Sequence, residues 1–156
     1  MKHCFGCDPQ NPAGLAIEFH RDGAGRLRAR CRPNENHCGL GNVVHGGLIA
    51  TIGEELAAAQ AGAGSDGGLV VTRLEVDYER PAYAGDAIDA SVTRVEHDGG
   101  RVIVSVELHS NDTRLAHLRS TFVLIDEERL RRIAGIGVTE APVCLVAGRG
   151  GRVVDT

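Results

Sequence analysis

Near the N-terminus, hydrophobic and polar residues alternate with a period of two. The runs 15–19 and 26–32 each place their hydrophobic residues at every second position, and four arginines fill the other positions of the second run. This alternation is typical of half-buried strands. The turn sequence Asp-Gly-Ala-Gly at 22–25 separates the two runs, so the pattern predicts an antiparallel hairpin.

The hydrophobic period then changes to that of a helix. From Gly46 to about Gly62, one face of a helix would collect Leu48, Ile49, Ile52, Leu56 and Ala59. The glycine-rich stretch 62–68 would end this helix.

Four more alternating runs follow, at 70–78, 88–92, 102–108 and 115–125, with Pro81 and short turns at 98–100 and 110–112 between them. Strands joined by short turns pair in antiparallel fashion. Two strands, one long helix and four strands predict an α+β domain in which one antiparallel sheet covers one helix. We assign this domain to residues 1–126.

Residues 127–156 differ in composition and form a predicted C-terminal extension. Charged residues at 127–132 indicate a short helix, an apolar patch follows at 143–147, and we expect low order after about Gly148.

Composition excludes several classes of function. The 156 residues carry a net charge of −4 and contain no Trp, two Tyr and three Phe, so the basic stripe or stacking aromatics of a nucleic-acid binder are missing. No apolar run approaches the length of a membrane span. Residues 1–19 lack the pattern of a signal peptide, and the five cysteines are an odd number, so we expect a cytoplasmic protein with reduced thiols.

One carboxylate lies on the helix face opposite the apolar stripe. Glu54 would point away from the sheet, among small residues rather than charged ones: Ala50, Thr51, Ala57, Ala58 and Ala61. We interpret this face as a subunit interface, where desolvation raises a carboxylate pKa and makes base or nucleophile chemistry plausible. A solvated helix glutamate is the simpler interpretation of the helix pattern alone, and Glu55 would lie at the rim.

The helix is preceded by His45-Gly46-Gly47. Backbone N–H groups at a helix N-terminus are unpaired, and the glycines leave them open to a ligand. Together with the helix dipole they suit a carbonyl oxygen that becomes an oxyanion. Glu54 follows His45 by nine residues, about two helical turns beyond the glycine pair.

The segment Val-His-Gly-Gly-Leu-Ile-Ala-Thr-Ile-Gly-Glu at 44–54 resembles the helix motif of hotdog-fold acyl-CoA thioesterases, in the branch that includes phenylacetyl-CoA thioesterases. In that branch His-Gly-Gly is followed by Asp or Glu nine positions after the His. Residues 4–7 with 11–15, and 74–81 with 85–86, also resemble patterns of this family. The resemblance covers about residues 4–125 and implies a hotdog fold, with the sheet wrapped around one long central helix.

The resemblance implies roles for individual residues. Glu54 would be the general base or the nucleophile, the N–H of Gly47 with that of Gly46 would hold the thioester oxygen, and His45 would orient the loop or polarise substrate. The site would lie between two subunits of a homodimer or homotetramer. Substrate-binding candidates are Asn42 before the motif, Thr72 on the partner's strand, and Arg80 for the CoA phosphates.

The pair Cys4 and Cys7 admits a zinc interpretation, with His37, Cys38 or Cys31 completing the ligands. The spacing fits no standard zinc finger, so we favour thiols in a packed loop and expect neither metal nor cofactor. The sequence thus predicts hydrolysis of an acyl-CoA or related thioester. The alternative is a non-catalytic hotdog domain that binds acyl-CoA as a carrier or sensor.

Overall fold

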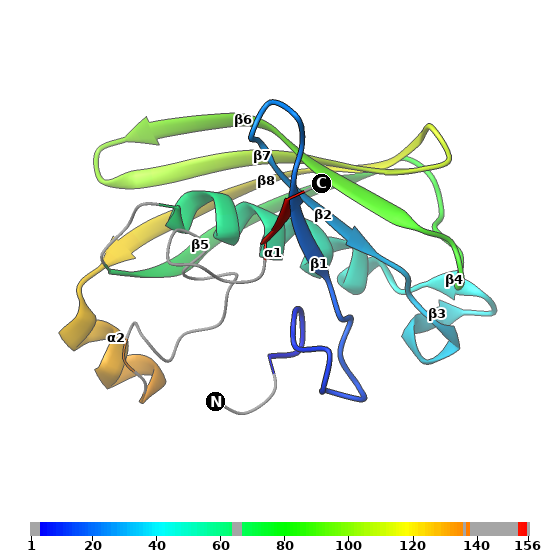
Figure 1. Ribbon diagram of the computed structural model, residues 1–156, viewed down its shortest axis with the longest axis horizontal. Helices are drawn as coiled ribbons and strands as arrows, with labels where there is room; N and C mark the ends of the chain where they lie inside the picture. The colour runs from blue at the N-terminus through cyan, green and yellow to red at the C-terminus, as the bar shows by residue number, and fades with distance from the viewer. Residues whose placement is uncertain (1–3, 64–66, 136, 138–152, 156) are drawn as a thin grey trace.

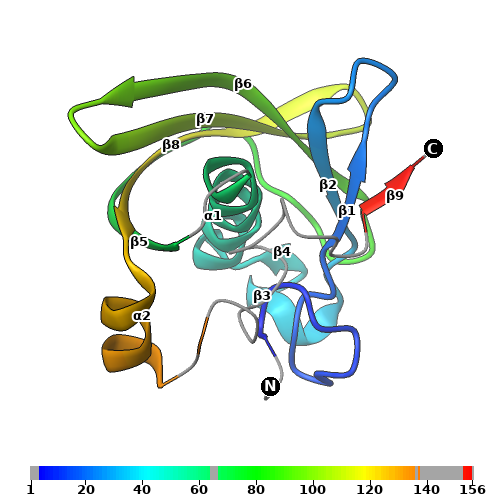
Figure 2. The same cartoon turned by 60° about the vertical axis from the view of Figure 1, so that its left-hand side comes forward.

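A curved sheet encloses one long helix in the computed structural model, which describes residues 4–63, 67–135, 137 and 153–155 (Figures 1 and 2). The described elements are β1 (Glu18–Arg21), β2 (Leu27–Cys31), a 3-10 turn η1 (Glu35–His37), β3 (Cys38–Leu40), β4 (Val43–Val44), α1 (Gly46–Gly62), β5 (Gly68–Tyr78), β6 (Ile88–Asp98), β7 (Arg101–Ser110), β8 (Thr113–Ile125), α2 (Glu127–Ala134) and β9 (Val153–Asp155).

The main sheet has the strand order β5-β8-β7-β6-β2-β1-β9. All neighbours pair antiparallel except the short β9, which pairs parallel to β1. The predicted α+β architecture and the predicted helix, from Gly46 to Gly62, are confirmed. No described helix has the length and apolar character needed to cross a bilayer.

The inner face of the sheet packs on α1 through an aliphatic core. Ile52 and Leu56 are fully buried there, and Ile49 is nearly so. Gly53 also faces the sheet, where a Cβ would lie 2.6 Å from Cδ2 of Leu118. The helix therefore approaches β8 more closely than any other residue at this position would permit.

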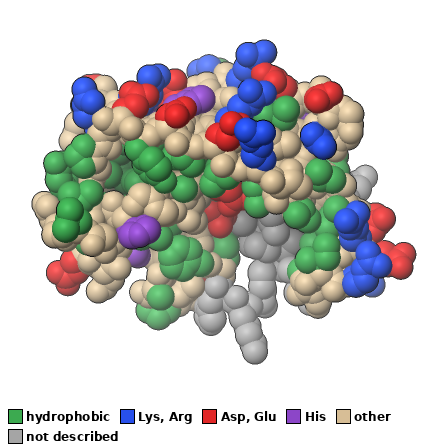
Figure 3. Space-filling model, turned by 180° about the vertical axis from the view of Figure 1, so that it is seen from behind, with side chains coloured by type: hydrophobic (Ala, Val, Ile, Leu, Met, Phe, Trp, Pro, Cys, Tyr) green, Lys and Arg blue, Asp and Glu red, His purple; other side chains and the backbone are tan. Residues whose placement is uncertain are grey.

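The outer face of the sheet is charged. Seen from behind, side chains of both signs crowd the upper part of the molecule, and hydrophobic side chains gather below them (Figure 3). On this face the Arg114–Glu107 ion pair links the neighbouring strands β8 and β7, and the Arg119–Glu96 pair reaches from β8 across β7 to β6. This surface is solvated, as the alternating pattern predicts.

Two strand boundaries differ from the prediction. Leu15 and Ile17 are buried as expected, but β1 begins only at Glu18, because Ala16 adopts a left-handed backbone conformation with φ of 48°. β6 continues to Asp98 rather than ending near Val92, because a bulge between Val92 and Arg94 shifts the alternation and so hides the rest of the strand from the sequence pattern.

The C-terminal extension begins with α2, in agreement with the predicted short helix. Asp126 caps it by accepting a hydrogen bond of 2.7 Å from the Arg129 N–H, and Gly135 ends it with φ of 70°. The predicted apolar patch at 143–147 lies outside the described residues, as does the chain after Gly148 apart from β9 and its contact with β1.

Candidate active site

The first turn of α1 leaves one backbone donor available. His45 is the N-cap, and its Nδ1 accepts a 2.9 Å hydrogen bond from the Gly47 N–H. Its carbonyl accepts the N–H of Leu48 at 2.8 Å. The Gly46 N–H makes no hydrogen bond to any described residue. Of the two predicted oxyanion donors, Gly46 is therefore open, whereas Gly47 is occupied by its own cap.

A tyrosine that the sequence analysis did not select fixes this turn to the sheet. The Tyr78 hydroxyl, at the end of β5, donates a 2.9 Å hydrogen bond to the Gly46 carbonyl. A Cβ on Gly46 would lie 3.4 Å from the Tyr78 ring. Nothing in the alternation of a strand reveals which helix end its last side chain meets, so only the fold could identify this contact.

The loop before the helix is built around two histidines. His37 is buried, its Nδ1 accepts the Asn34 N–H at 3.0 Å, and its carbonyl accepts the His45 N–H at 2.9 Å. Gly39 lies against the His45 ring, where a Cβ would come within 2.9 Å of Cδ2. These contacts hold the His45 ring against Gly47.

A groove of about 340 Å³ opens beside Gly46. Its walls come from β4, the start of α1 and the segment after β5, and it is lined by Val43, Val44, Gly46, Ile49, Tyr78, Glu79, Arg80, Pro81 and Ala82. The predicted phosphate ligand Arg80 and the donor Gly46 thus share one groove. Asn42 is exposed in the loop that leads into it, and its carbonyl accepts the Ala84 N–H at 3.0 Å.

Glu54 does not line this groove in the same chain. It lies on the same helix face as Gly47, seven residues and about 10 Å further along the axis. The carboxylate is half-buried, and desolvation, with a smaller effect from nearby Cys4, raises the pKa of Glu54. A raised pKa was the expected consequence of burial.

The helix face around Glu54, which we predicted to be a subunit interface, is partly buried within the single chain. Ala57, Ala58 and Ala61, which we expected to face a second subunit, are already buried within the single chain. The N-terminal segment lies beneath α1, on the side away from the sheet (Figure 2), and Cys4 and Cys7 pack against the core there. The sequence pattern of the helix could not reveal that a segment of the same chain covers this face.

Thr72 lies away from the groove. It is the extra residue of a bulge in β5, and its hydroxyl donates to the Thr121 carbonyl at 3.2 Å. It lines a hollow that also includes outer-face residues such as Arg119. Six residues of strand, about 20 Å, separate it from Tyr78. Any contact of Thr72 with the groove would have to cross a subunit boundary.

The zinc ligands considered from sequence are not brought together. Cys4 Sγ and Cys7 Sγ lie 3.2 Å apart, but Cys31 Sγ donates to the Leu15 carbonyl, and His37 is held by Asn34. The group that does join the two cysteines is the Glu55 carboxylate.

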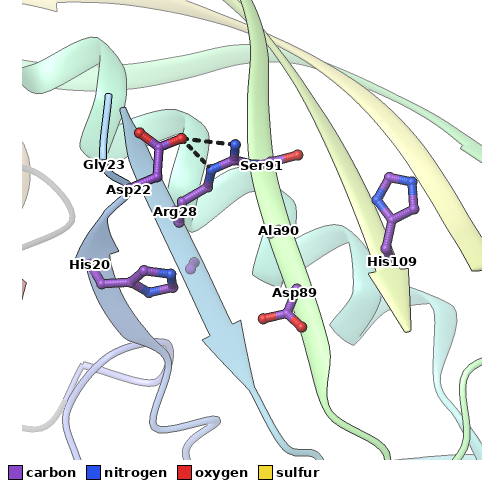
Figure 4. A pocket seen from close by; sticks show the side chains of 9 residues that line it. His20, Asp22, Gly23, Arg28, Asp89, Ala90, Ser91 and His109 are labelled. Carbon is purple, nitrogen blue, oxygen red and sulfur yellow. Dashed lines mark hydrogen bonds and ion pairs between the residues drawn. The ribbon is translucent and has the colours of Figure 1, made fainter. Parts of the chain in front are cut away.

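A larger hollow of about 460 Å³ lies on the outer face of the sheet, among β1, β2, β6 and β7. Asp22 and Arg28 are paired there at 2.9 Å, while His20, Asp89 and His109 stand apart from one another (Figure 4). Asp89 pairs instead with Arg30 at 2.7 Å. Because both of its carboxylates are already paired with arginines and it faces away from α1, this hollow does not contribute to the candidate site.

Comparisons with known proteins agree on the fold. A model of the thioesterase superfamily matches residues 41–117, which include the helix motif and Arg80. The structure is similar to the Escherichia coli PaaI protein from the phenylacetic acid degradation operon, at 21% identity and a TM-score of 0.62 over 71% of this chain and 80% of that chain. Thioesterase HI1161 from Haemophilus influenzae gives 19% identity and a TM-score of 0.63 over 72% and 80% of the chains.

The BH2602 protein from Bacillus halodurans, solved with CoA, is similar at 18% identity and a TM-score of 0.60, over 69% of this chain and 71% of that chain. A search of the curated proteins found no match. These likenesses confirm the predicted hotdog fold.

Proposed function

We propose that this chain, whose residues 41–117 match the model of the thioesterase superfamily and which has the hotdog fold, hydrolyses an acyl-CoA or a related thioester. The observation that carries the proposal is the groove lined by both Arg80 and Gly46, since the Gly46 N–H makes no hydrogen bond to any described residue. A thioester carbonyl would accept the hydrogen bond, and Arg80 would pair with a CoA phosphate.

The Gly46 N–H would do most in the transition state. As the carbonyl carbon is attacked, negative charge develops on its oxygen, and a fixed donor at the positive end of α1 stabilises that charge. The Gly47 N–H would become a second donor only if the His45 ring turned away from it. Glu54 would activate water as general base or attack the carbon itself, and the thiolate would leave without acid assistance.

We propose that the site is shared between two subunits, because Glu54 is separated from the groove of its own chain. β5 is an edge strand, and Val71, Leu74 and Tyr78 on it remain substantially exposed. A second copy that paired with this edge would cover these side chains and could bring its own Glu54 toward Gly46. The proposed assembly is a homodimer or homotetramer, and the proposed location is the cytoplasm.

Further proposed substrate contacts come from Asn42 and Thr72. Asn42 is exposed in the loop that leads to the groove, and Thr72 would act from the partner's β5. The similar BH2602 protein was solved with CoA, which supports CoA as the carrier. No cofactor is needed, because a carboxylate, a water molecule and a backbone donor suffice for hydrolysis.

A thiol-release assay over a panel of acyl-CoAs tests the proposal, with Glu54→Gln as the matched variant. Gln keeps the size of the side chain and removes its charge. We expect wild-type hydrolysis of at least one substrate and a loss of about 100-fold or more in the variant. Equal rates of wild type and variant on every substrate would refute the proposal.

The second candidate is a non-catalytic acyl-CoA carrier or sensor. It is favoured by the His45 cap on Gly47, which leaves a single open donor. Calorimetric titration with a non-hydrolysable acyl-CoA analogue separates the two functions. Tight binding together with no thiol release would favour the carrier.

A further inference from the structure

Three side chains that can bind a metal meet beneath α1. The Sγ atoms of Cys4 and Cys7 and a carboxylate oxygen of Glu55 all lie within 4.8 Å of one another, and the two sulfurs are 3.2 Å apart. All three residues are half-buried. The cysteines come from the N-terminal segment and the carboxylate from the middle of the helix, so the cluster joins two elements distant in sequence.

The N-terminal loop holds the two sulfurs in place. The Cys7 N–H donates to Cys4 Sγ at 3.4 Å and so holds this sulfur beside Cys7. The Leu15 N–H donates to the Phe5 carbonyl and the Ile17 N–H to the Gly6 carbonyl, each at 2.8 Å. These ladder bonds tie the loop to the chain that leads into β1.

Gly6 gives the carboxylate its access to the sulfurs. A Cβ at this position would overlap Cδ and Oε1 of Glu55 and lie 2.8 Å from its Cγ. Any other residue at position 6 would therefore displace the Glu55 side chain. The missing side chain of Gly6 thus leaves the space that the Glu55 carboxylate occupies beside the two sulfurs.

We propose that Cys4, Cys7 and Glu55 bind one Zn²⁺ ion. Two thiolates and one carboxylate are a donor set that suits zinc, whereas Mg²⁺ and Ca²⁺ require oxygen donors alone. Tetrahedral zinc–sulfur bonds place two sulfurs roughly 3.8 Å apart, so the pair would need to open by about half an ångström. Three protein ligands leave the fourth position to water.

The carboxylate distinguishes this site from a redox pair. A disulfide between Cys4 and Cys7 would use both sulfurs and would not explain why the Glu55 carboxylate lies beside them. Three groups that are anionic as ligands would repel one another in a half-buried cluster, and a dication would compensate that charge. The ion would tether the N-terminal segment to α1, next to Glu54. The proposed zinc site does not depend on whether the protein hydrolyses thioesters.

Zinc titration of the 156-residue protein, stripped of metal by a chelator and kept reduced, tests the site. We expect wild type to bind one equivalent of Zn²⁺ and to melt at a higher temperature with zinc than without it. Co²⁺ in place of zinc should give a thiolate charge-transfer band and the strong visible bands of a tetrahedral ion.

Three variants define the ligands. Cys4→Ser and Cys7→Ser should lose the bound equivalent and the cobalt charge-transfer band, while their circular dichroism shows that they remain folded. Glu55→Gln should weaken zinc binding by at least the roughly 10–100-fold that a supporting group contributes at zinc sites. Cys38→Ser is the matched control, because Cys38 is a half-buried thiol outside the cluster, and it should bind like wild type.

Several results would overturn the proposal. These are failure of wild type to bind a full equivalent, binding that survives in Cys4→Ser and Cys7→Ser, and wild-type affinity in Glu55→Gln. Mass spectrometric detection of a Cys4–Cys7 disulfide in protein purified without oxidant would also overturn it, in favour of the redox pair.

Discussion

The Tyr78 hydroxyl donates a 2.9 Å hydrogen bond to the Gly46 carbonyl, and so ties the last residue of β5 to the first residue of α1. The two residues also line the candidate groove. The position of the proposed oxyanion donor is therefore set from two sides, by the His45 cap within the helix and by Tyr78 from the sheet.

Removing only the hydroxyl of Tyr78 should loosen this connection. Tyr78→Phe keeps the ring against Gly46 and deletes the donor, so we expect a loss of about 1 kcal/mol in the free energy of unfolding. Urea denaturation measures it. Tyr83→Phe is the control, because its hydroxyl makes no hydrogen bond to the described residues, and it should stay within about 0.5 kcal/mol of wild type. Equal effects of both changes would show that the Tyr78 bond is not formed.

The Gly46 N–H can be deleted almost alone. Gly46 is the first helical residue, where proline fits, and His45 already has the φ of −59° and ψ of 131° that a residue before proline adopts. Gly46→Pro should therefore keep the fold and lower kcat about 100–1,000-fold, as the loss of one oxyanion donor does.

The control for this change is Gly47→Ala, which retains its N–H although its Cβ would lie 3.0 Å from His45 Nδ1. It should keep most of the activity. The thiol-release rates of both variants, together with their melting temperatures, separate loss of the donor from loss of structure. A fully active Gly46→Pro would exclude Gly46 as the donor.

Gly53 should tolerate no side chain. Alanine normally favours a helix over glycine, yet its Cβ would lie 2.6 Å from Leu118 Cδ2. We expect Gly53→Ala to destabilise the protein by about 1–3 kcal/mol, as overpacking does. Gly23→Ala, with no heavy atom within 4 Å of its Cβ, should stay near wild type. Thermal melts of the two proteins test this; a Gly53→Ala protein more stable than wild type would show that α1 can move away from β8.

Asp22 should make the protein more sensitive to acid. Its carboxylate accepts hydrogen bonds from the Arg26 N–H at 2.9 Å and from the Arg28 guanidinium at 2.9 and 3.1 Å, and these lower the pKa of Asp22. A lowered folded-state pKa contributes stability above the unfolded value of about 4, and that stability is lost as the pH falls toward the folded value.

Asp22→Asn should therefore be less stable than wild type at pH 7 and pH 5, and the difference should shrink below about pH 4. The midpoints of urea denaturation at pH 7, at pH 5 and below about pH 4 measure this difference in stability. Glu128→Gln is the control, because Glu128 forms no ion pair within the described residues, and its difference from wild type should not depend on pH in this way. If the loss of stability in Asp22→Asn grew as the pH fell, it would contradict a lowered pKa of Asp22 in the folded protein.

The sequence was sufficient for much of the fold because side-chain periodicity is local. Alternation in 102–108 and the helical stripe through Ile52 reflect which faces are buried, and both are confirmed. The boundaries that differ are those where one backbone angle or one bulge interrupts the period, at Ala16 and after Val92. Neither event leaves a trace in hydrophobicity.

The candidate site was less accessible to such reasoning. The motif located His45, Gly46 and Glu54, but which N–H is open depends on the orientation of one imidazole. The contacts of Tyr78 and Glu55 join elements far apart in the chain, and only the fold brings them together.

A shared site predicts rescue between two inactive variants. Glu54→Gln retains its own groove, and Gly46→Pro retains its own carboxylate. In a mixed dimer of the two, one of the two sites would combine the intact Gly46 of one subunit with the intact Glu54 of the other. The isolated mixed dimer should therefore have about half of the wild-type activity.

The measurement is thiol release after the two variants are co-expressed, with the mixed dimer isolated by two different affinity tags. Each variant alone, carried through the same purification, gives the baseline. If the mixed dimer is no more active than the baseline while its mass confirms one copy of each chain, Gly46 and Glu54 do not act across the interface. In that case the roughly 12 Å between Gly46 and Glu54 along α1 would have to be bridged within one chain by the substrate and its attacking water.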